Sequence, residues 1–123
     1  MRWVMFSRMV KNEQFIALAS AFPEVSVEPH FETISFRVNK KIFATINPPE
    51  RRACVKFDAL QQDLFCSFDR SVIYPVPNKW GTHGWTNINL KKVQLRTLKD
   101  ALKTAYCLTA PRKLAALVDA GLA

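Results

Sequence analysis

The amino-acid sequence predicts an α+β fold, a two-layer sandwich in which an antiparallel sheet carries helices on one face. Several short segments are rich in β-branched and aromatic residues and are joined by short turns, which favours antiparallel pairing. Amphipathic helical stripes stand near both ends of the chain. The 123 residues are 49% apolar and 23% charged, a composition typical of one globular domain with its own core.

The first helix is indicated by apolar residues at i, i+3, i+4 and i+7, which are Phe15, Leu18, Ala19 and Phe22. Asn12 is expected to cap this helix and Pro23 to end it. The domain is predicted to span residues 9–123. Residues 1–8 have two interpretations, a loose extension ahead of the domain or a segment whose apolar side chains dock on the core.

Residues 24–32 read as an acidic, turn-like stretch, and two strands are predicted after it, at 33–38 and 42–46. Asn39-Lys40 is expected to form the turn between them, because asparagine tolerates the left-handed conformation that such turns need. The two strands and their turn therefore form a β-hairpin.

The register of this hairpin has two alternatives. A two-residue loop sets Val38 opposite Lys41, whereas a three-residue loop sets Val38 opposite Ile42. In the second case six apolar residues share one face, and these are Ile34, Phe36, Val38, Ile42, Ala44 and Ile46. The sequence pattern leaves both registers open.

Strands and helices alternate in the rest of the chain. A strand is predicted at 53–57, and Asp58 with Gln61 has the spacing of a capping box, which indicates a short helix at 59–66. Further along, the pattern predicts a brief strand at 72–74, a strand at 85–90, a helix with an apolar face from Leu95 to Tyr106, and a short helix at 112–119.

The formal charge of +8 is unevenly distributed. Residues 1–69 hold nine Lys or Arg against eight Asp or Glu, and residues 70–123 hold nine against two. Such a balance attracts polyanions such as nucleic acid, and it serves solubility equally well.

The three cysteines are interpreted as buried free thiols in a reducing compartment. Because no apolar run has the length of a membrane span, a cytoplasmic, non-membrane protein is expected.

The stretch from Tyr74 to Leu90 is the best candidate for a site, since it contains two of the three tryptophans, two of the three glycines and one of the two histidines. Lys79 beside Trp80 combines charge for phosphates with a ring on which bases stack, and His83 and Trp85 are close by. In the alternative interpretation, both tryptophans cover the apolar face of the sheet while Lys79 is merely solvated.

A second candidate surface is formed by basic residues of the hairpin and of the turn that follows it. These residues are Arg37, Lys40, Lys41, Arg51 and Arg52. Together they resemble a wing that lies along a nucleic-acid backbone. As exposed charges, they equally suit a role in solvation alone.

Other chemistry finds little support in the sequence. His83 has no carboxylate nearby to orient it, so a structural role is favoured over proton transfer. Glu28, His30 and Glu32 alternate along an extended segment, where a solvated acidic stretch is favoured over a metal site. No serine or cysteine stands in a nucleophile elbow, and three glycines are too few for a phosphate loop. Neither an enzyme nor a cofactor or metal is predicted.

Four blocks of sequence carry a resemblance to a known family, and these are Phe22-Pro23-Glu24-Val25, Phe36 to Ala44, Pro77 to Trp85 and Ala105-Tyr106. In this order they resemble the MmcQ/YjbR-like family of small bacterial proteins over nearly everything after residue 9. The resemblance implies a CyaY-like and frataxin-like fold, also described as a double wing. It also implies the DNA-binding label that such proteins often carry.

Two departures from the family pattern concern the candidate surface. Asn39-Lys40 replaces a glycine-rich turn and makes the hairpin tip more basic, and Trp80-Gly81-Thr82 makes the loop bulkier. The predicted function is DNA binding through the basic hairpin wing and the Trp/Gly loop. The alternatives are a non-catalytic module that binds a protein or small ligand in a Trp-lined groove, and a hydrolase or isomerase that uses His83.

Overall fold

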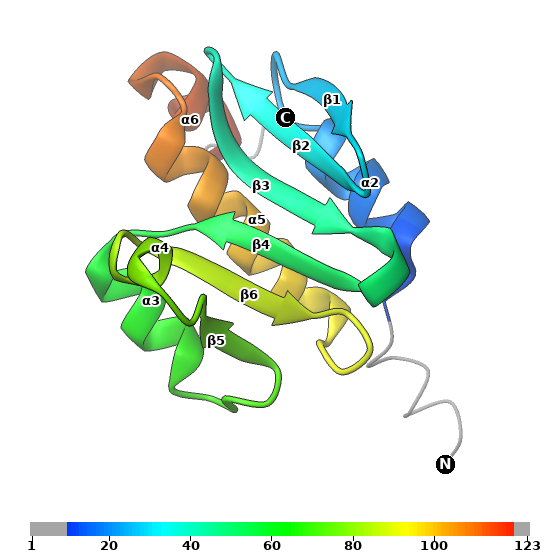
Figure 1. Cartoon of the computed structure of the whole chain (residues 1–123). Coiled ribbons are helices and arrows are strands. Elements are labelled where there is room, and N and C mark those ends of the chain that lie inside the picture. Colours follow the sequence, from blue (N-terminus) through cyan, green and yellow to red (C-terminus); the bar gives the residue numbers. More distant parts are fainter. Residues whose placement is uncertain (1–9, 120–123) are drawn as a thin grey trace.

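Six strands form one antiparallel sheet in the order β1-β2-β3-β4-β6-β5 (Figure 1). The structure is a computed structural model that describes residues 10–119, so the predictions made for residues 1–8 lie outside the described part of the chain. Every neighbouring pair of strands is antiparallel, as the sequence predicts. The strands span Ser26–His30 (β1), Thr33–Val38 (β2), Lys41–Asn47 (β3), Arg52–Lys56 (β4), Ile73–Pro75 (β5) and Trp85–Asn89 (β6).

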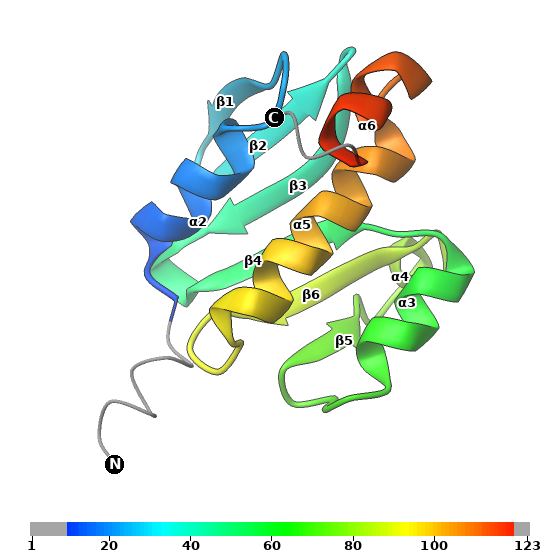
Figure 2. The ribbon, with the colours of Figure 1, turned by 180° about the vertical axis from the view of Figure 1, so that it is seen from behind.

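Helices cover one face of the sheet and leave the other face open, as Figures 1 and 2 show from opposite sides. The helices span Asn12–Ser20 (α2), Ala59–Cys66 (α3), Lys79–Thr82 (α4), Leu95–Thr109 (α5) and Arg112–Asp119 (α6), and a 3-10 turn, η1, spans Pro48–Glu50. Helix α5 crosses the middle of the covered face, with α2, α3 and α6 around it (Figure 2). The predicted two-layer α+β sandwich is therefore confirmed.

Strand β1 corrects the prediction that residues 24–32 are turn-like. Its Glu, Pro and His residues have low strand propensity, and all five residues of the strand are exposed. They are extended because the free edge of β2 pairs with β1 along its whole length. Pro29 is tolerated there, since β1 is an outer strand of the sheet. Backbone pairing with β2 has therefore outweighed the low strand propensity of these residues.

The β2–β3 hairpin combines the two registers that the sequence leaves open. Asn39-Lys40 forms a two-residue turn with φ values of 51° and 68°, and Val38 lies opposite Lys41. A β-bulge then leaves Phe43 without a partner in β2, and beyond it the pairing follows the register expected for a three-residue loop. The bulge thus reconciles a tight turn with a continuous apolar face.

The core lies between the sheet and α5. Tyr106 of α5 is fully buried, stacks on Phe22 with 4.8 Å between ring centroids, and meets Phe43 edge-on at 5.4 Å. Its hydroxyl donates a hydrogen bond of 2.7 Å to the carbonyl oxygen of Pro23, which ties α5 to the segment after α2. The predicted core residues that are fully buried include Phe15, Ala19, Leu98, Leu102 and Ala105.

The starts of two helices test the predictions made from local spacing. Asp58 caps α3 as predicted, because its Oδ1 accepts a hydrogen bond of 2.8 Å from the backbone N–H of Gln61. Asn12 does not cap α2: Lys11 takes that place, and Asn12 instead donates through Nδ2 to the carbonyl oxygen of Pro48 at 3.1 Å.

Within residues 10–119, no helix is long and apolar enough to cross a membrane.

Candidate functional site

The strand directions divide the sheet into two ends, and the predicted site residues are split between them. The hairpin end holds the turn Asn39-Lys40, the last residue of β4, Lys56, its cross-strand partner Trp85, and helix α4. The η1 end holds η1 and the two residues that follow it, Arg51 and Arg52. The seven-residue strand β3 runs from one end to the other.

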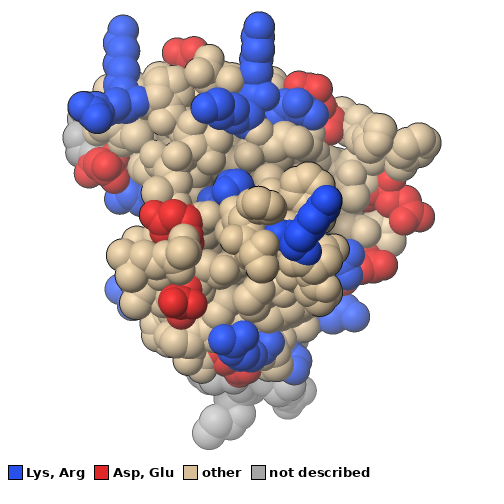
Figure 3. All heavy atoms as spheres, turned by 60° about the vertical axis from the view of Figure 1, so that its left-hand side comes forward, with Lys and Arg blue, Asp and Glu red and all other residues tan. Residues whose placement is uncertain are grey.

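The hairpin end carries several cations that are far apart in the sequence, and two of them, Lys41 and Lys56, share a pocket. Lys40 and Lys41 are exposed at the turn, and Lys79 is exposed on α4. Lys41 and Lys56 line one pocket of about 310 Å³, whose other walls are Ile42, Phe57, Asp58, Leu108 and Thr109. Figure 3 looks onto this end, where basic side chains stand along the upper rim and in the middle, with carboxylates between them. The surface is basic, but its charge is mixed.

A short helix, α4, replaces the loop that the sequence predicts ahead of β6. Asn78 caps it, since its Oδ1 accepts a hydrogen bond of 2.8 Å from the backbone N–H of Trp80. Gln62 of α3 donates through Nε2 to the carbonyl oxygens of Gly81 at 2.9 Å and Trp85 at 3.3 Å. Helix α3 therefore holds the segment that carries both tryptophans.

The two glycines of this segment are required by close backbone contacts. A Cβ atom on Gly81 would lie 2.0 Å from the carbonyl oxygen of Val76. Gly84 has a φ of +101°, and a Cβ atom there would lie 1.8 Å from the carbonyl oxygen of Phe57. The chain can therefore bring α4 this close to the end of the sheet only with glycine at these positions.

Neither tryptophan covers the apolar face of the sheet, so that alternative interpretation is wrong. Trp80 is 55% exposed, and the ring of His83 lies edge-on to it with 6.4 Å between centroids. Trp85 is half-buried and stands opposite Lys56 on the open face, because the buried Thr86 beside it points to the helices. The ammonium group of Lys56 donates to the carbonyl oxygen of His83 at 2.5 Å, which holds this charge beside α4.

The predicted cations at the η1 end are engaged within the fold. Arg51 has a left-handed φ of 49°, and its Nη2 donates a hydrogen bond of 2.9 Å to the carbonyl oxygen of Val10. Arg52 forms an ion pair with Glu50. Because the length of β3 separates them from Lys41, these two arginines do not join the surface at the hairpin end.

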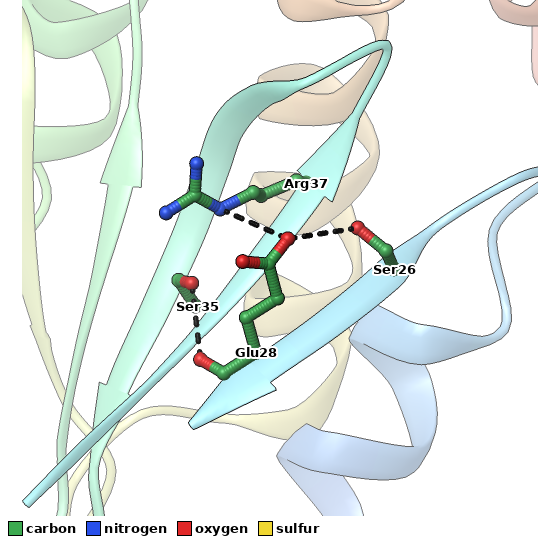
Figure 4. Close-up of polar contacts among 4 residues, drawn as sticks. All are labelled: Ser26, Glu28, Ser35 and Arg37. Carbon is green, nitrogen blue, oxygen red and sulfur yellow. Dashed lines mark hydrogen bonds and ion pairs between the residues drawn. The ribbon is translucent and has the colours of Figure 1, made fainter. Parts of the chain in front are cut away.

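Arg37 also has a partner within the fold. Figure 4 shows its guanidinium against Glu28 of the neighbouring strand β1, with 3.4 Å between Nε and Oε2. The hydroxyl of Ser26 donates to the same carboxylate at 3.5 Å, and the hydroxyl of Ser35 donates to the Glu28 carbonyl oxygen at 3.1 Å. Among residues 10–119, no group of three or more His, Cys, Asp or Glu side chains is placed to hold a metal ion.

A row of polar side chains crosses the open face of the sheet through successive register partners, which are Glu28, Ser35, Thr45, Cys54, Asn87 and Tyr74. Burial raises the pKa of the Cys54 thiol to about 11, and smaller effects of a hydrogen bond to the Thr86 backbone and of the Arg52 charge oppose this rise. The thiol is therefore neutral near pH 7 and a poor nucleophile. Cys54, Cys66 and Cys107 are all free, but only Cys66 is fully buried.

Lys56 is the residue of the hairpin end that the sequence analysis missed. Alternation along β4 places Arg52, Cys54 and Lys56 on one face, while Ala53 and Val55 are buried in the core. This period of two was a signal that could have added Lys56 to the candidate residues.

A small domain with an antiparallel sheet, one open face and a basic end that exposes a tryptophan is the class of protein that these observations define. The chain belongs to the YjbR family, whose family model matches residues 20–108. Its structure is similar to the crystal structure of Deinococcus radiodurans protein DR2400, described as a DUF419 domain. The TM-score is 0.73 and the sequence identity 19%, over 94% of this chain and 91% of that chain. No curated protein matches the sequence.

Proposed function

We propose that this YjbR-family domain binds DNA through the surface at the hairpin end. The observation that carries the proposal is that Lys40, Lys41, Lys79 and the ring of Trp80 are all exposed and all belong to elements at the same end of the sheet. Lysines neutralise phosphates without regard to sequence, and an exposed indole offers a face on which an unpaired base can stack. Lys56 adds a fourth cation to this surface.

The proposed surface differs from the one predicted from the sequence. Arg51 and Arg52 are assigned to the fold of the η1 end, and Arg37 contributes only when its pair with Glu28 opens. His83 and Trp85 support the surface from α4 and β6. The CyaY-like, double-wing description and a cytoplasmic location are retained as parts of this proposal, the latter because three free thiols suit a reducing compartment.

Single-stranded DNA is the preferred ligand in this proposal. Stacking on Trp80 requires an unpaired base, whereas the lysines attract the phosphates of single and double strands alike. We therefore expect tighter binding of a single strand than of a duplex of the same length. Trp80→Ala is expected to remove this difference while leaving weak, salt-dependent binding of both.

The test is a fluorescence anisotropy titration of labelled single-stranded and double-stranded DNA at two salt concentrations. The site variant Lys40→Glu/Lys41→Glu is compared with the matched variant Lys91→Glu/Lys92→Glu, which changes the net charge equally at two exposed lysines that follow the far end of β6. The site variant should lose at least about tenfold in affinity and the control about twofold, since contact charges matter more than distant ones.

Two results would overturn the proposal. One is wild-type binding no tighter than about 10⁻⁴ M, the weak limit of non-specific association. The other is an equal loss in both double variants, which would mean that net charge and not this surface attracts the DNA. A Trp-lined groove for a protein or small ligand is less well supported, because the pocket between Lys41 and Lys56 has neither tryptophan in its walls. Binding to such a groove would be nearly indifferent to salt.

A further inference from the structure

Two exposed apolar patches of opposite charge lie in the helical layer. The acidic patch belongs to α3 and the residues beside it, and consists of Asp58, Leu60, Asp63, Leu64 and Phe68. The basic patch belongs to α5 and α6, and consists of Lys103, Leu108, Arg112, Lys113 and Leu117. Asp58 and Leu108 also line the pocket that holds Lys41 and Lys56, so the two patches border the surface proposed to bind DNA.

The acidic patch exposes large apolar side chains four residues apart, so they follow one side of α3. Leu60 is 64% exposed, Leu64 is 51% exposed and Phe68, just beyond the helix, is 81% exposed. Residues 57–69 contain three Asp and no Lys or Arg, in a chain whose formal charge is +8. Contiguous exposed apolar groups on a soluble domain mark a surface that another molecule covers.

The basic patch has the complementary composition. Leu108 is 46% exposed and Leu117 is 40% exposed, on two helices that pack on each other. Residues 100–119 contain three Lys or Arg and two Asp, and Asp100 and Asp119 line one pocket with Lys103 and Leu108, so the net charge of the basic patch comes from Arg112 and Lys113 on α6. Within residues 10–119, neither Lys113 nor Asp63 of the acidic patch has an ion-pair partner, so both charges are free to meet a partner molecule.

The two patches adjoin each other on the same side of the molecule. Asp58, at the start of α3, and Leu108, near the end of α5, line the same pocket of about 310 Å³. Figure 2 shows α3 and α6 on the same face of the sheet, on either side of the end of α5. The two patches therefore lie side by side, with the pocket at their border.

We propose that a second copy of this chain covers these patches, and that the acidic patch of each copy docks on the basic patch of the other. A two-fold axis brings adjoining patches of opposite charge into contact twice, which is the self-complementarity that a symmetric dimer requires. Formation of this dimer buries the exposed apolar side chains of both patches. Charge complementarity sets the register of the pair, because a shifted arrangement places carboxylates on carboxylates.

The test is sedimentation velocity of the full chain over a range of concentrations at low and high salt, with three samples. Asp63→Lys and Lys113→Asp are each measured alone, and an equimolar mixture of the two is measured as the third sample. Each variant alone places like charges at both contacts of a dimer, whereas the mixture restores one opposite pair at each contact. Circular dichroism confirms that these substitutions of exposed residues leave the fold intact.

The expected result is a wild-type dimer with twice the 14.1 kDa mass of the chain, weakened by salt. The single variants should lose at least about tenfold in dimer affinity, and the mixture should recover most of it. A wild-type protein that stays monomeric up to about 1 mM would overturn the proposal. A dimer unaffected by either substitution would overturn it too, because its interface would then lie elsewhere. DNA binding by the same variants is measured separately, so the two proposals fail independently.

Discussion

The two ends of the sheet use the same kind of side chain for different purposes. At the η1 end, Arg51 and Arg52 are bound to a backbone carbonyl and to a carboxylate of the same chain. At the hairpin end, Lys40 and Lys79 are exposed, and an exposed tryptophan accompanies them. Both arginines at the η1 end have partners within the fold, whereas at the hairpin end Lys56 has a backbone partner and Lys40 and Lys79 are left to solvent.

This difference shows why a count of cations along the sequence is a poor guide to a binding surface. The hairpin and the turn after β3 have similar local charge, and both are natural candidates for contact with phosphates. What separates them is the presence of acceptors at the η1 end. The Val10 carbonyl oxygen is brought near Arg51 only by the folded chain, and the Glu50 carboxylate lies two residues before Arg52 in the sequence. An exposed cation without an internal partner is the better candidate for recognition.

The largest expected effect concerns the glycine that fixes the hairpin end. Gly84→Ala places a Cβ atom 1.8 Å from the Phe57 carbonyl oxygen at a φ of +101°, so we expect a loss of about 3 kcal/mol in the free energy of unfolding. Urea denaturation measures it. Thr82→Ala on the exposed side of α4 is the control and should cost at most about 1 kcal/mol. Similar losses in both variants would show that α4 is not held tightly.

The next effect concerns Cys54, midway along β4 between the two ends. The folded protein keeps the thiol proton up to its raised pKa of about 11, whereas the unfolded chain releases it near the ordinary value of 9.0. The stabilisation from this neutral thiol is therefore complete below pH 9 and is lost as the pH rises from 9 through 11, by about 2–3 kcal/mol for a pKa raised from 9.0 to about 11. Denaturation at several pH values should show a shallower decline for Cys54→Ala. Identical slopes would contradict the assigned burial of the thiol.

A pair of substitutions tests the comparison of the two ends directly. Arg51→Gln removes the charged donor to the Val10 carbonyl oxygen, and we expect a loss of about 1.5 kcal/mol in stability with no change in DNA affinity. Lys79→Gln should do the reverse, with stability unchanged and affinity about threefold weaker. Thermal unfolding and anisotropy are measured on both proteins. If both substitutions weaken DNA binding equally, the two ends do not differ in function.

The smallest effect concerns the ion pair of Arg37. Glu28→Gln removes the counter-charge that Figure 4 shows, so Arg37 becomes available to a phosphate and the DNA affinity should rise about twofold. Stability should change by no more than about 0.5 kcal/mol, because the pair is partly exposed. Glu50→Gln frees Arg52 at the η1 end and is the matched control, for which no rise is expected. If DNA affinity rises only in the Glu50→Gln control, the DNA binds at the η1 end and the proposed surface is wrong.

Features with a local cause were predictable from the sequence. The Asp58 cap, the helix that it starts and the Asn39-Lys40 turn depend on residues within three positions of one another, and all three are confirmed. Features with distant partners were not predictable. The Asn12 side chain donates a hydrogen bond to the carbonyl oxygen of Pro48, which is distant in the sequence. Strand β1 is extended because it pairs with β2, although its own residues favour a turn.

The candidate site follows the same division. Lys79, Trp80 and the glycines around them were recognisable from residue type alone. Few short segments contain a cation, a large aromatic ring and glycines with unusual backbone freedom together. Lys56 needed the strand alternation of β4, and the exclusion of Arg51 needed Val10, which is 41 positions away. A hydrogen bond between residues that are far apart in the chain depends on their proximity in the folded structure. The sequence around either residue does not indicate it.

By itself, the sequence determined the α+β class, the hairpin turn, most of the helices and the excess of positive charge, because these depend on periodicity, turn chemistry and composition. Tertiary structure alone decided the mixed register around Phe43, the pairing of β1 with β2 and the hydrogen bond that engages Arg51 at the η1 end. The reason is that backbone pairing and the neutralisation of charge are settled by groups that meet only after the chain has closed its long loops.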